Sequence, residues 1–316
     1  MNGSASFRRK IWTPRAVGWE IGSLPSLLHP MIRIFTALCS LFAFGMAMAA
    51  PAPEVIPLWP EQAPVGDGTF EKTEAKLTLH RPEKPNGAVL VICPGGGYGT
   101  LVRDGEGHKI ATWLNTHGIT GVVLEYRLPA GRSKVPLLDA QRALRTVRAN
   151  AKDWNCDVDK VGIIGFSAGG HLAATAATRF DDGDRAAKDP IDRQGCRPDF
   201  AVLVYPVITM GENTHGGSRS KLLGPTPTEE TIALYSAEKQ VTAKTSPTYL
   251  THAVDDKTVP VSHSRSFHEA LKANKVPCEY LELPSGGHGL NGYKGPMWDA
   301  WQAGALKWME ERKLVK

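Results

Sequence analysis

Short apolar segments rich in β-branched residues alternate with longer segments of helical periodicity from residue 88 onward. Parallel strands require long crossover connections, usually helices, so this alternation predicts a mostly parallel central sheet with helices on both faces. The strands are almost wholly apolar, as strands covered on both faces must be. The sequence therefore predicts an α/β fold. The expected strands are 88–93, 120–126, 161–166, 200–205, 248–253 and 278–283, with an edge strand at 76–80.

The alternation stops between residues 207 and 246, where Gly, Pro, Ser and Thr are frequent and one short helical stretch occurs at 228–236. We expect this segment to be a small insertion after the sixth strand, over the carboxyl edge of the sheet, as a candidate lid or substrate wall. The longer helices between the strands are expected at 107–117, 136–151, 168–178, 262–273 and 297–312.

The first 49 residues have the character of targeting sequence. Residues 31–49 combine a positive start, an apolar run and small residues at the end, which is the layout of a secretory signal peptide. Residues 1–30 are then an extension from an upstream start codon, and 50–316 is one α/β domain that is secreted or periplasmic, with no membrane contact after signal cleavage. The alternative is an organelle transit peptide that uses Arg8, Arg9, Lys10 and Arg15.

The net charge of the chain limits the classes of partner that it can attract electrostatically. The formal net charge is +5, but residues 1–49 contribute +4 of it, so the remaining domain is close to neutral. A nearly neutral domain has no electrostatic footprint for nucleic acid or an anionic membrane. His263 and His268 are five residues apart on a predicted helix and do not share a face, and no His-Glu-x-x-His motif occurs, so no metal site is expected.

Four cysteines lie outside the predicted signal peptide, and no two of them have Cys-x-x-Cys spacing, which disfavours zinc and redox motifs. Cys156 and Cys196 each precede a predicted strand by about five residues, a spacing that would bring both to one edge of the sheet. A Cys156–Cys196 disulfide is therefore one interpretation, and four small buried thiols are the other.

The run 165–169 has the pattern Gly-x-Ser-x-Gly and stands between a predicted buried strand and a predicted helix. A nucleophilic serine at a tight strand-to-helix turn needs small neighbours, because side chains at Gly165 or Gly169 would crowd the adjacent strand or helix. The start of the helix also favours negative charge on a bound substrate. Ser167 is therefore the candidate nucleophile.

A second glycine cluster, 94–98, follows the first central strand. Backbone N–H groups can approach a reacting oxygen only where no side chain blocks them. We expect the N–H of Ala168 and that of Gly96 or Gly97 to form an oxyanion hole. A flexible turn or a phosphate-binding loop is the alternative, although the Gly-Lys-Ser/Thr ending of phosphate loops is absent from this cluster.

A candidate acid and base follow the serine in chain order. His288 lies on a glycine-rich loop after strand 278–283 and is expected to be the general base. Asp255 and Asp256 follow strand 248–253. Asp256 is favoured as the acid that orients His288, while Asp255 would cap or orient its loop, and the choice between them stays open.

Several aromatic and histidine side chains near these loops are candidates for lining a substrate pocket, with core packing as the alternative for each. They are Tyr98, Tyr205, His215 and Trp298. His171, just after the serine, is expected to pack or hydrogen-bond beneath the site.

Five motifs, 94–98, 125–129, 165–172, 197–200 and 286–289, together resemble bacterial esterases of the acetyl xylan or feruloyl esterase-like type, also called xylanase-B-like hydrolases. The resemblance spans about residues 55–310 and implies an α/β-hydrolase fold, a Ser-Asp-His triad and hydrolysis of short acyl esters of plant polysaccharide. Many related esterases carry His before the glycines, where this chain has Cys93-Pro94. The resemblance therefore implies an oxyanion hole at this loop but not its detailed geometry.

We therefore expect removal of short acyl groups, acetyl first, from carbohydrate such as acetylated xylan, through an acyl-enzyme on Ser167 and without a cofactor. A feruloyl esterase or a general short-chain carboxylesterase is the nearest alternative. A prolyl-oligopeptidase-like peptidase would need a gating domain for which the chain is too short. A catalytically silent carbohydrate-binding fold is disfavoured by the intact triad.

Overall fold

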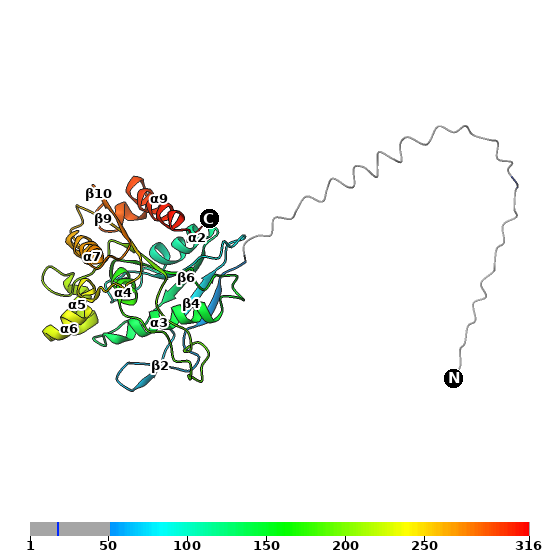
Figure 1. Ribbon diagram of the computed structural model, residues 1–316, viewed down its shortest axis with the longest axis horizontal. Coiled ribbons are helices and arrows are strands. Elements are labelled where there is room, and N and C mark those ends of the chain that lie inside the picture. The colour runs from blue at the N-terminus through cyan, green and yellow to red at the C-terminus, as the bar shows by residue number, and fades with distance from the viewer. Residues whose placement is uncertain (1–17, 19–50, 316) are drawn as a thin grey trace, which may run out of the picture. The chain divides into compact units, whose positions relative to one another are not determined.

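The apolar segments predicted as strands pair in one eight-stranded sheet of the computed structural model, which describes residues 18 and 51–315 (Figure 1). The strand order is β1-β4-β6-β5-β7-β8-β9-β10. β1 and β4 pair antiparallel, as do β4 and β6, and the other pairs are parallel, which confirms the predicted mostly parallel sheet. The strands are β1 (Glu54–Pro57), β4 (Lys76–His80), β5 (Val89–Cys93), β6 (Thr120–Glu125), β7 (Val161–Phe166), β8 (Phe200–Val204), β9 (Thr248–Ala253) and β10 (Cys278–Leu283).

Helices cover both faces of this sheet, and each face has its own hydrophobic core. Successive residues of β5 point to opposite sides, so Val91 joins one core and Ile92 the other. The first core contains residues of α3 (Lys134–Ala149), α4 (Ser167–Thr178) and α7 (Ser262–Ala273). The second contains residues of α2 (Lys109–Thr116) and α9 (Pro296–Glu311), which lie side by side in Figure 1.

Several short elements have no counterpart among the predicted ones. They are exposed or polar and too short to show a clear hydrophobic period, which is the signal that identified the others. They are β1, the hairpin of β2 (Gln62–Pro64) and β3 (Phe70–Lys72), the π-helix Asp104–His108, α5 (Gly216–Leu223), the 3₁₀ helix Ala237–Gln240 and α8 (Leu290–Tyr293). Within the segment 207–246, the predicted helical stretch is α6 (Glu229–Tyr235).

Of the two interpretations of the cysteines, the Cys156–Cys196 disulfide is wrong, since the four cysteines of residues 51–315 are all free thiols. Cys156 lies beside Thr120 at the start of β6, whereas the sulfur of Cys196 contacts Asp181 near β8. β5 and β7 separate β6 from β8. Strands about 4.8 Å apart then put β6 and β8 about 14 Å from each other, beyond the reach of a disulfide.

The predicted signal peptide, 31–49, and the predicted extension, 1–30, lie outside the described residues apart from Gly18. The described part from residue 51 to 315 belongs to one compact unit. In that part, no helix has the length and apolar character that a bilayer span requires.

A buried ion pair joins the loop after β6 to α3. Asp139 is fully buried, and its carboxylate accepts hydrogen bonds from the guanidinium and the backbone N–H of Arg127. The indole of Trp59, from the loop after β1, donates to the same carboxylate at 2.7 Å. One carboxylate thus holds three segments together.

Replacing Asp139 by Ala should lower the free energy of unfolding by about 3 kcal/mol or more, because it leaves the buried guanidinium of Arg127 without its main partner. Urea denaturation of both proteins measures this loss. Glu311→Ala is the control, since it removes an exposed pair with Lys307 and should leave the unfolding midpoint unchanged. Equal midpoints for all three proteins would contradict this account of Asp139.

Candidate active site

Ser167 occupies a tight turn between β7 and α4. Its φ is +53°, in the left-handed region that residues with a side chain avoid. A Cβ at Gly165 would overlap the backbone of Gly169, and a Cβ at Gly169 would overlap the carbonyl of Cys93. The two glycines are therefore needed by the turn that places Ser167 at the carboxyl end of the sheet.

Three predicted residues converge at this turn. Nε2 of His288 lies 2.9 Å from Oγ of Ser167, and Nδ1 of His288 lies 2.7 Å from Oδ2 of Asp256. They follow β7, β9 and β10, whose carboxyl ends share one edge of the sheet. When Nδ1–H donates to Asp256, Nε2 is free to accept the hydroxyl proton of Ser167.

Asp256 is held as an anion by its surroundings. Burial would raise its pKa, but hydrogen bonds from His252 and His288, and from the backbone N–H of Val259, hold the pKa well below its usual range. The N–H of Thr258 donates to the same carboxylate at 2.8 Å. An ionised carboxylate against Nδ1 can stabilise an imidazolium on His288.

Asp255 contacts a different group. Its carboxylate accepts the backbone N–H groups of Gly286, at 3.2 Å, and Gly287, at 2.8 Å. These glycines belong to the loop that carries His288, so Asp255 orients that loop while Asp256 contacts the imidazole itself. The structure therefore separates two aspartates that the sequence left as alternatives.

The glycine cluster after β5 lies directly against Ser167. Gly96 and Gly97 have φ of +125° and +62°, conformations that favour glycine. A Cβ at Gly95 would lie 3.0 Å from Cβ of Ser167, so no side chain separates this loop from the hydroxyl. In residues 51–315, the N–H groups of Gly96 and Gly97 donate to no other protein group. They are available, with the N–H of Ala168 at the start of α4, for an oxyanion.

Three of the four pocket candidates lie in the cores instead. Tyr98 is 2% exposed, and its hydroxyl lies 2.8 Å from Nδ1 of His171, so it packs under the site with that histidine. Tyr205 is fully buried, with its ring centroid 4.8 Å from that of His288. Trp298 packs in the second core against Phe166. Their aromatic rings fill space between the sheet and its helices, which sequence spacing alone does not reveal.

His215 is the pocket candidate that does reach the site. It caps α5 by accepting the N–H of Ser218 at Nδ1, and burial lowers its pKa. A Cβ at Gly97 would lie 3.7 Å from Cε1 of His215. The insertion 207–246 therefore supplies a side chain beside the glycine loop.

His252 contributes to the site and was not among the predicted residues. Its Nε2 lies 3.2 Å from Asp256 and 3.0 Å from the carbonyl of Val259, and its Nδ1 lies 2.9 Å from the hydroxyl of Ser264. Two acceptors at Nε2 place the ring hydrogen there, so His252 donates to Asp256. A histidine inside the fully buried strand 248–253 was the signal that could have revealed it.

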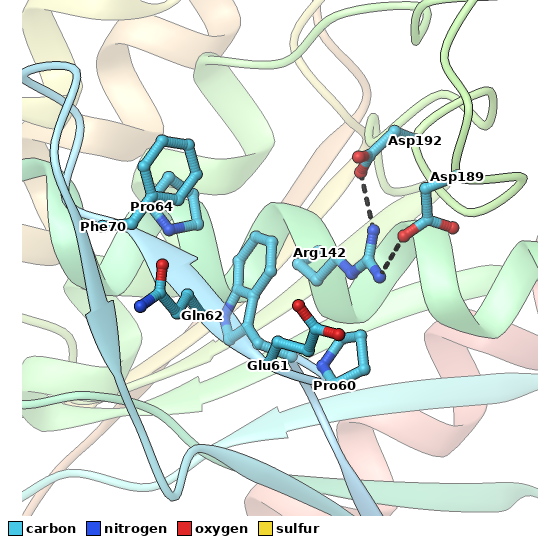
Figure 2. A pocket seen from close by; sticks show the side chains of 9 residues that line it. Pro60, Glu61, Gln62, Pro64, Phe70, Arg142, Asp189 and Asp192 are labelled. Carbon is cyan, nitrogen blue, oxygen red and sulfur yellow. Dashed lines mark hydrogen bonds and ion pairs between the residues drawn. The ribbon is translucent and has the colours of Figure 1, made fainter.

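A cavity of about 620 Å³ lies between the β2–β3 hairpin and α3 (Figure 2). Trp59 and Phe70 line it, and Arg142 bridges Asp189 and Asp192 at its rim. These carboxylates are therefore engaged by a guanidinium. None of the triad residues lines this cavity.

A family model described as BD-FAE matches residues 77–271, which include Ser167 and Asp256. This is more than half of the chain. The chain belongs to the BD-FAE family. His288 lies beyond the matched segment, so its place in this BD-FAE protein rests on the geometry above.

Relatives of this BD-FAE chain include endo-1,4-beta-xylanase B of Butyrivibrio fibrisolvens, 38% identical over 72% of the chain and 36% of that protein. Acetylxylan esterase of Xylanibacter ruminicola is 36% identical over 69% of the chain and 44% of that protein. The chain thus spans less than half the length of these two relatives. The crystal structure of the acetyl ester-xyloside bifunctional hydrolase from Caldicellulosiruptor lactoaceticus has 38% identity and a TM-score of 0.79, covering 85% of this chain and 100% of that one. The predicted family and the predicted α/β-hydrolase fold are confirmed.

The two aspartates should differ sharply in their effect on ester hydrolysis. Asp256→Asn places an amide against Nδ1 of His288 and favours the wrong tautomer, so kcat should fall about 10³- to 10⁴-fold. Asp255→Asn is the matched control: its amide oxygen can still accept a glycine N–H, and kcat should stay within about tenfold. Steady-state kinetics on p-nitrophenyl acetate measures both. A larger loss in Asp255→Asn would reverse the two roles.

Proposed function

We propose that this chain is a serine carboxylic ester hydrolase that removes short acyl groups, acetyl first, from carbohydrate such as acetylated xylan. The observation that carries the proposal is the contact of His288 with both Ser167 and Asp256, at a turn beside backbone N–H groups that donate to no other group of residues 51–315. The names of the relatives support the substrate class, since one is an acetylxylan esterase and one solved neighbour is an acetyl ester-xyloside bifunctional hydrolase.

In the first half-reaction, Oγ of Ser167 attacks the ester carbonyl carbon while Nε2 of His288 takes the hydroxyl proton. The negative oxygen of the tetrahedral intermediate accepts hydrogen bonds from Ala168 N–H and from Gly96 or Gly97 N–H. Collapse of the intermediate breaks the bond to the sugar oxygen. His288 returns the proton to that oxygen, and the acyl group stays on Ser167.

In the second half-reaction, His288 takes a proton from water, which attacks the acyl-enzyme. The second tetrahedral intermediate uses the same N–H groups and releases acetate as Ser167 regains its proton. Asp256 stabilises the imidazolium in both steps, because its pKa is held low enough to keep it ionised. Serine, histidine and water supply every proton and electron pair, so the mechanism uses no cofactor.

The predicted signal peptide fits this proposal, because a polysaccharide is too large to enter the cell. Hydrolysis would then take place outside the cytoplasm. The insertion 207–246, through His215, would form a wall beside the acyl group and is the segment expected to influence which ester fits.

Acetate release from acetylated xylan, set beside ferulate release from methyl ferulate, tests the function and the substrate together. The wild type should release acetate with at least tenfold higher kcat/KM than ferulate. Ser167→Ala should lose both activities by about 10³-fold or more, because it removes the nucleophile. A wild type inactive on both esters contradicts the esterase, and a preference for ferulate contradicts only the acetyl assignment.

A further inference from the structure

Glu106 is a buried carboxylate that takes no part in the proposed reaction. It lies in the π-helix Asp104–His108 before α2 and is 3% exposed. Burying a carboxylate is costly unless hydrogen bonds compensate, so such a residue is seldom found inside a protein without a structural or functional reason. π-Helical turns are themselves often associated with functional sites.

The carboxylate of Glu106 accepts three hydrogen bonds. Oε2 accepts the backbone N–H of Gly95 at 2.7 Å. Oε1 accepts the hydroxyl of Tyr205 at 3.0 Å and the hydroxyl of Tyr293 at 3.1 Å. Burial raises the pKa of Glu106, and these hydrogen bonds oppose that rise.

The three donors come from three separate loops around the reacting atoms. Gly95 begins the glycine loop after β5, Tyr205 follows β8, and Tyr293 ends the short segment that follows His288. The ring of Tyr205 also packs against the ring of His288. One carboxylate therefore connects the expected oxyanion loop with two segments that contact or carry the base.

Each of these loops has backbone in the left-handed region. The glycine loop contains Gly96, Gly97 and Tyr98, while Tyr205 has φ of +38° and Tyr293 has φ of +66°. Side chains disfavour such conformations, which persist where the surroundings hold them. Glu106 is placed to hold all three, because a carboxylate at this point satisfies a donor from each loop.

Gly95 is confined between Glu106 and the nucleophile. A Cβ on this residue would lie 2.6 Å from Oε2 of Glu106 and 3.0 Å from Cβ of Ser167. The next two residues are those whose N–H groups are expected to donate to an oxyanion. Catalytic donors have to be held within about 0.5 Å of the productive geometry, so a loop released at Gly95 would lose their alignment.

We propose that Glu106 is the positioning residue of the oxyanion hole: its carboxylate fixes the N–H of Gly95 and thereby the donors of Gly96 and Gly97. It touches no reacting atom and acts through the loop. The inference rests on the proposed esterase function, and it adds a fourth side chain on which the rate depends.

Glu106→Asp tests this role. The side chain is shorter by one methylene, about 1.5 Å, and cannot keep Gly95 and both tyrosines within hydrogen-bond distance at once. We expect kcat on p-nitrophenyl acetate to fall about 100-fold while KM stays within about threefold, because the oxyanion donors stabilise the transition state more than the bound substrate. A purely structural role would lower the amount of folded enzyme, and the folded fraction would keep the wild-type kcat and KM.

Two further variants serve as controls. Glu106→Gln keeps an oxygen for the N–H of Gly95, and its amide can donate to the tyrosine hydroxyls, which can turn to accept. It should retain kcat within about fivefold. Asp104→Asn changes an exposed carboxylate of the same π-helix, paired with Lys109, and should retain wild-type kinetics.

The outcomes separate this inference from the proposed function. If the wild type hydrolyses esters and Ser167→Ala does not, but Glu106→Asp keeps kcat within threefold or changes only KM, the positioning role is wrong and the esterase stands. If Glu106→Asp does not fold, Glu106→Met decides, because it keeps a similar volume and removes the oxygen that accepts the N–H of Gly95. A folded variant whose kcat falls about 100-fold with KM within threefold supports the role, and one with kcat within threefold overturns it. An inactive wild type is a failure of the proposed function instead.

Discussion

The tight turn at Ser167 is the constraint on which the rest of the site depends. Its left-handed backbone requires close contact between β7, α4 and the loop after β5, and glycine at 165 and 169 makes that contact sterically feasible. The same closeness brings the N–H groups of the glycine loop against the hydroxyl. Because the neighbouring strands are parallel, their carboxyl ends deliver Asp256 and His288 to the same edge.

Much of the fold could be predicted because each central element has its own local signal. The predicted strands 161–166, 248–253 and 278–283 coincide with β7, β9 and β10. β7 and β9 are buried along their whole length, and the edge strand β10 alternates between apolar and polar residues over part of its length. The β2–β3 hairpin and α5 lacked that signal. The Cys156–Cys196 bridge was wrong although the strands after the two cysteines, β7 and β8, are neighbours, because the paths of the preceding loops decide where each thiol lies and have no signal in local sequence.

The residues of the site also fall into those that the sequence predicted and those that it missed. The chain order of Ser167, Asp256 and His288 indicated a triad because a chemical mechanism requires those groups, and the structure brings them within hydrogen-bond distance. Tyr98 and Tyr205 fill the cores, which was the alternative to a pocket role, because burial depends on packing across the sheet. His252 and Glu106 were missed because their role lies in holding another residue: His252 donates to Asp256, and Glu106 accepts from Gly95. Such supporting residues can be identified only from the three-dimensional structure, because their contacts join loops that are far apart in the sequence.

The central claim is that Ser167 is a nucleophile activated by its surroundings, and covalent labelling tests it most directly. An ethyl fluorophosphonate probe reacts with an activated serine and stays attached, so peptide mass spectrometry can locate the label. We expect one label per chain, on the peptide containing Ser167, and a strongly reduced labelling rate in Asp256→Asn. An unlabelled Ser167 in a preparation that hydrolyses p-nitrophenyl acetate, or a label on another residue, would contradict it.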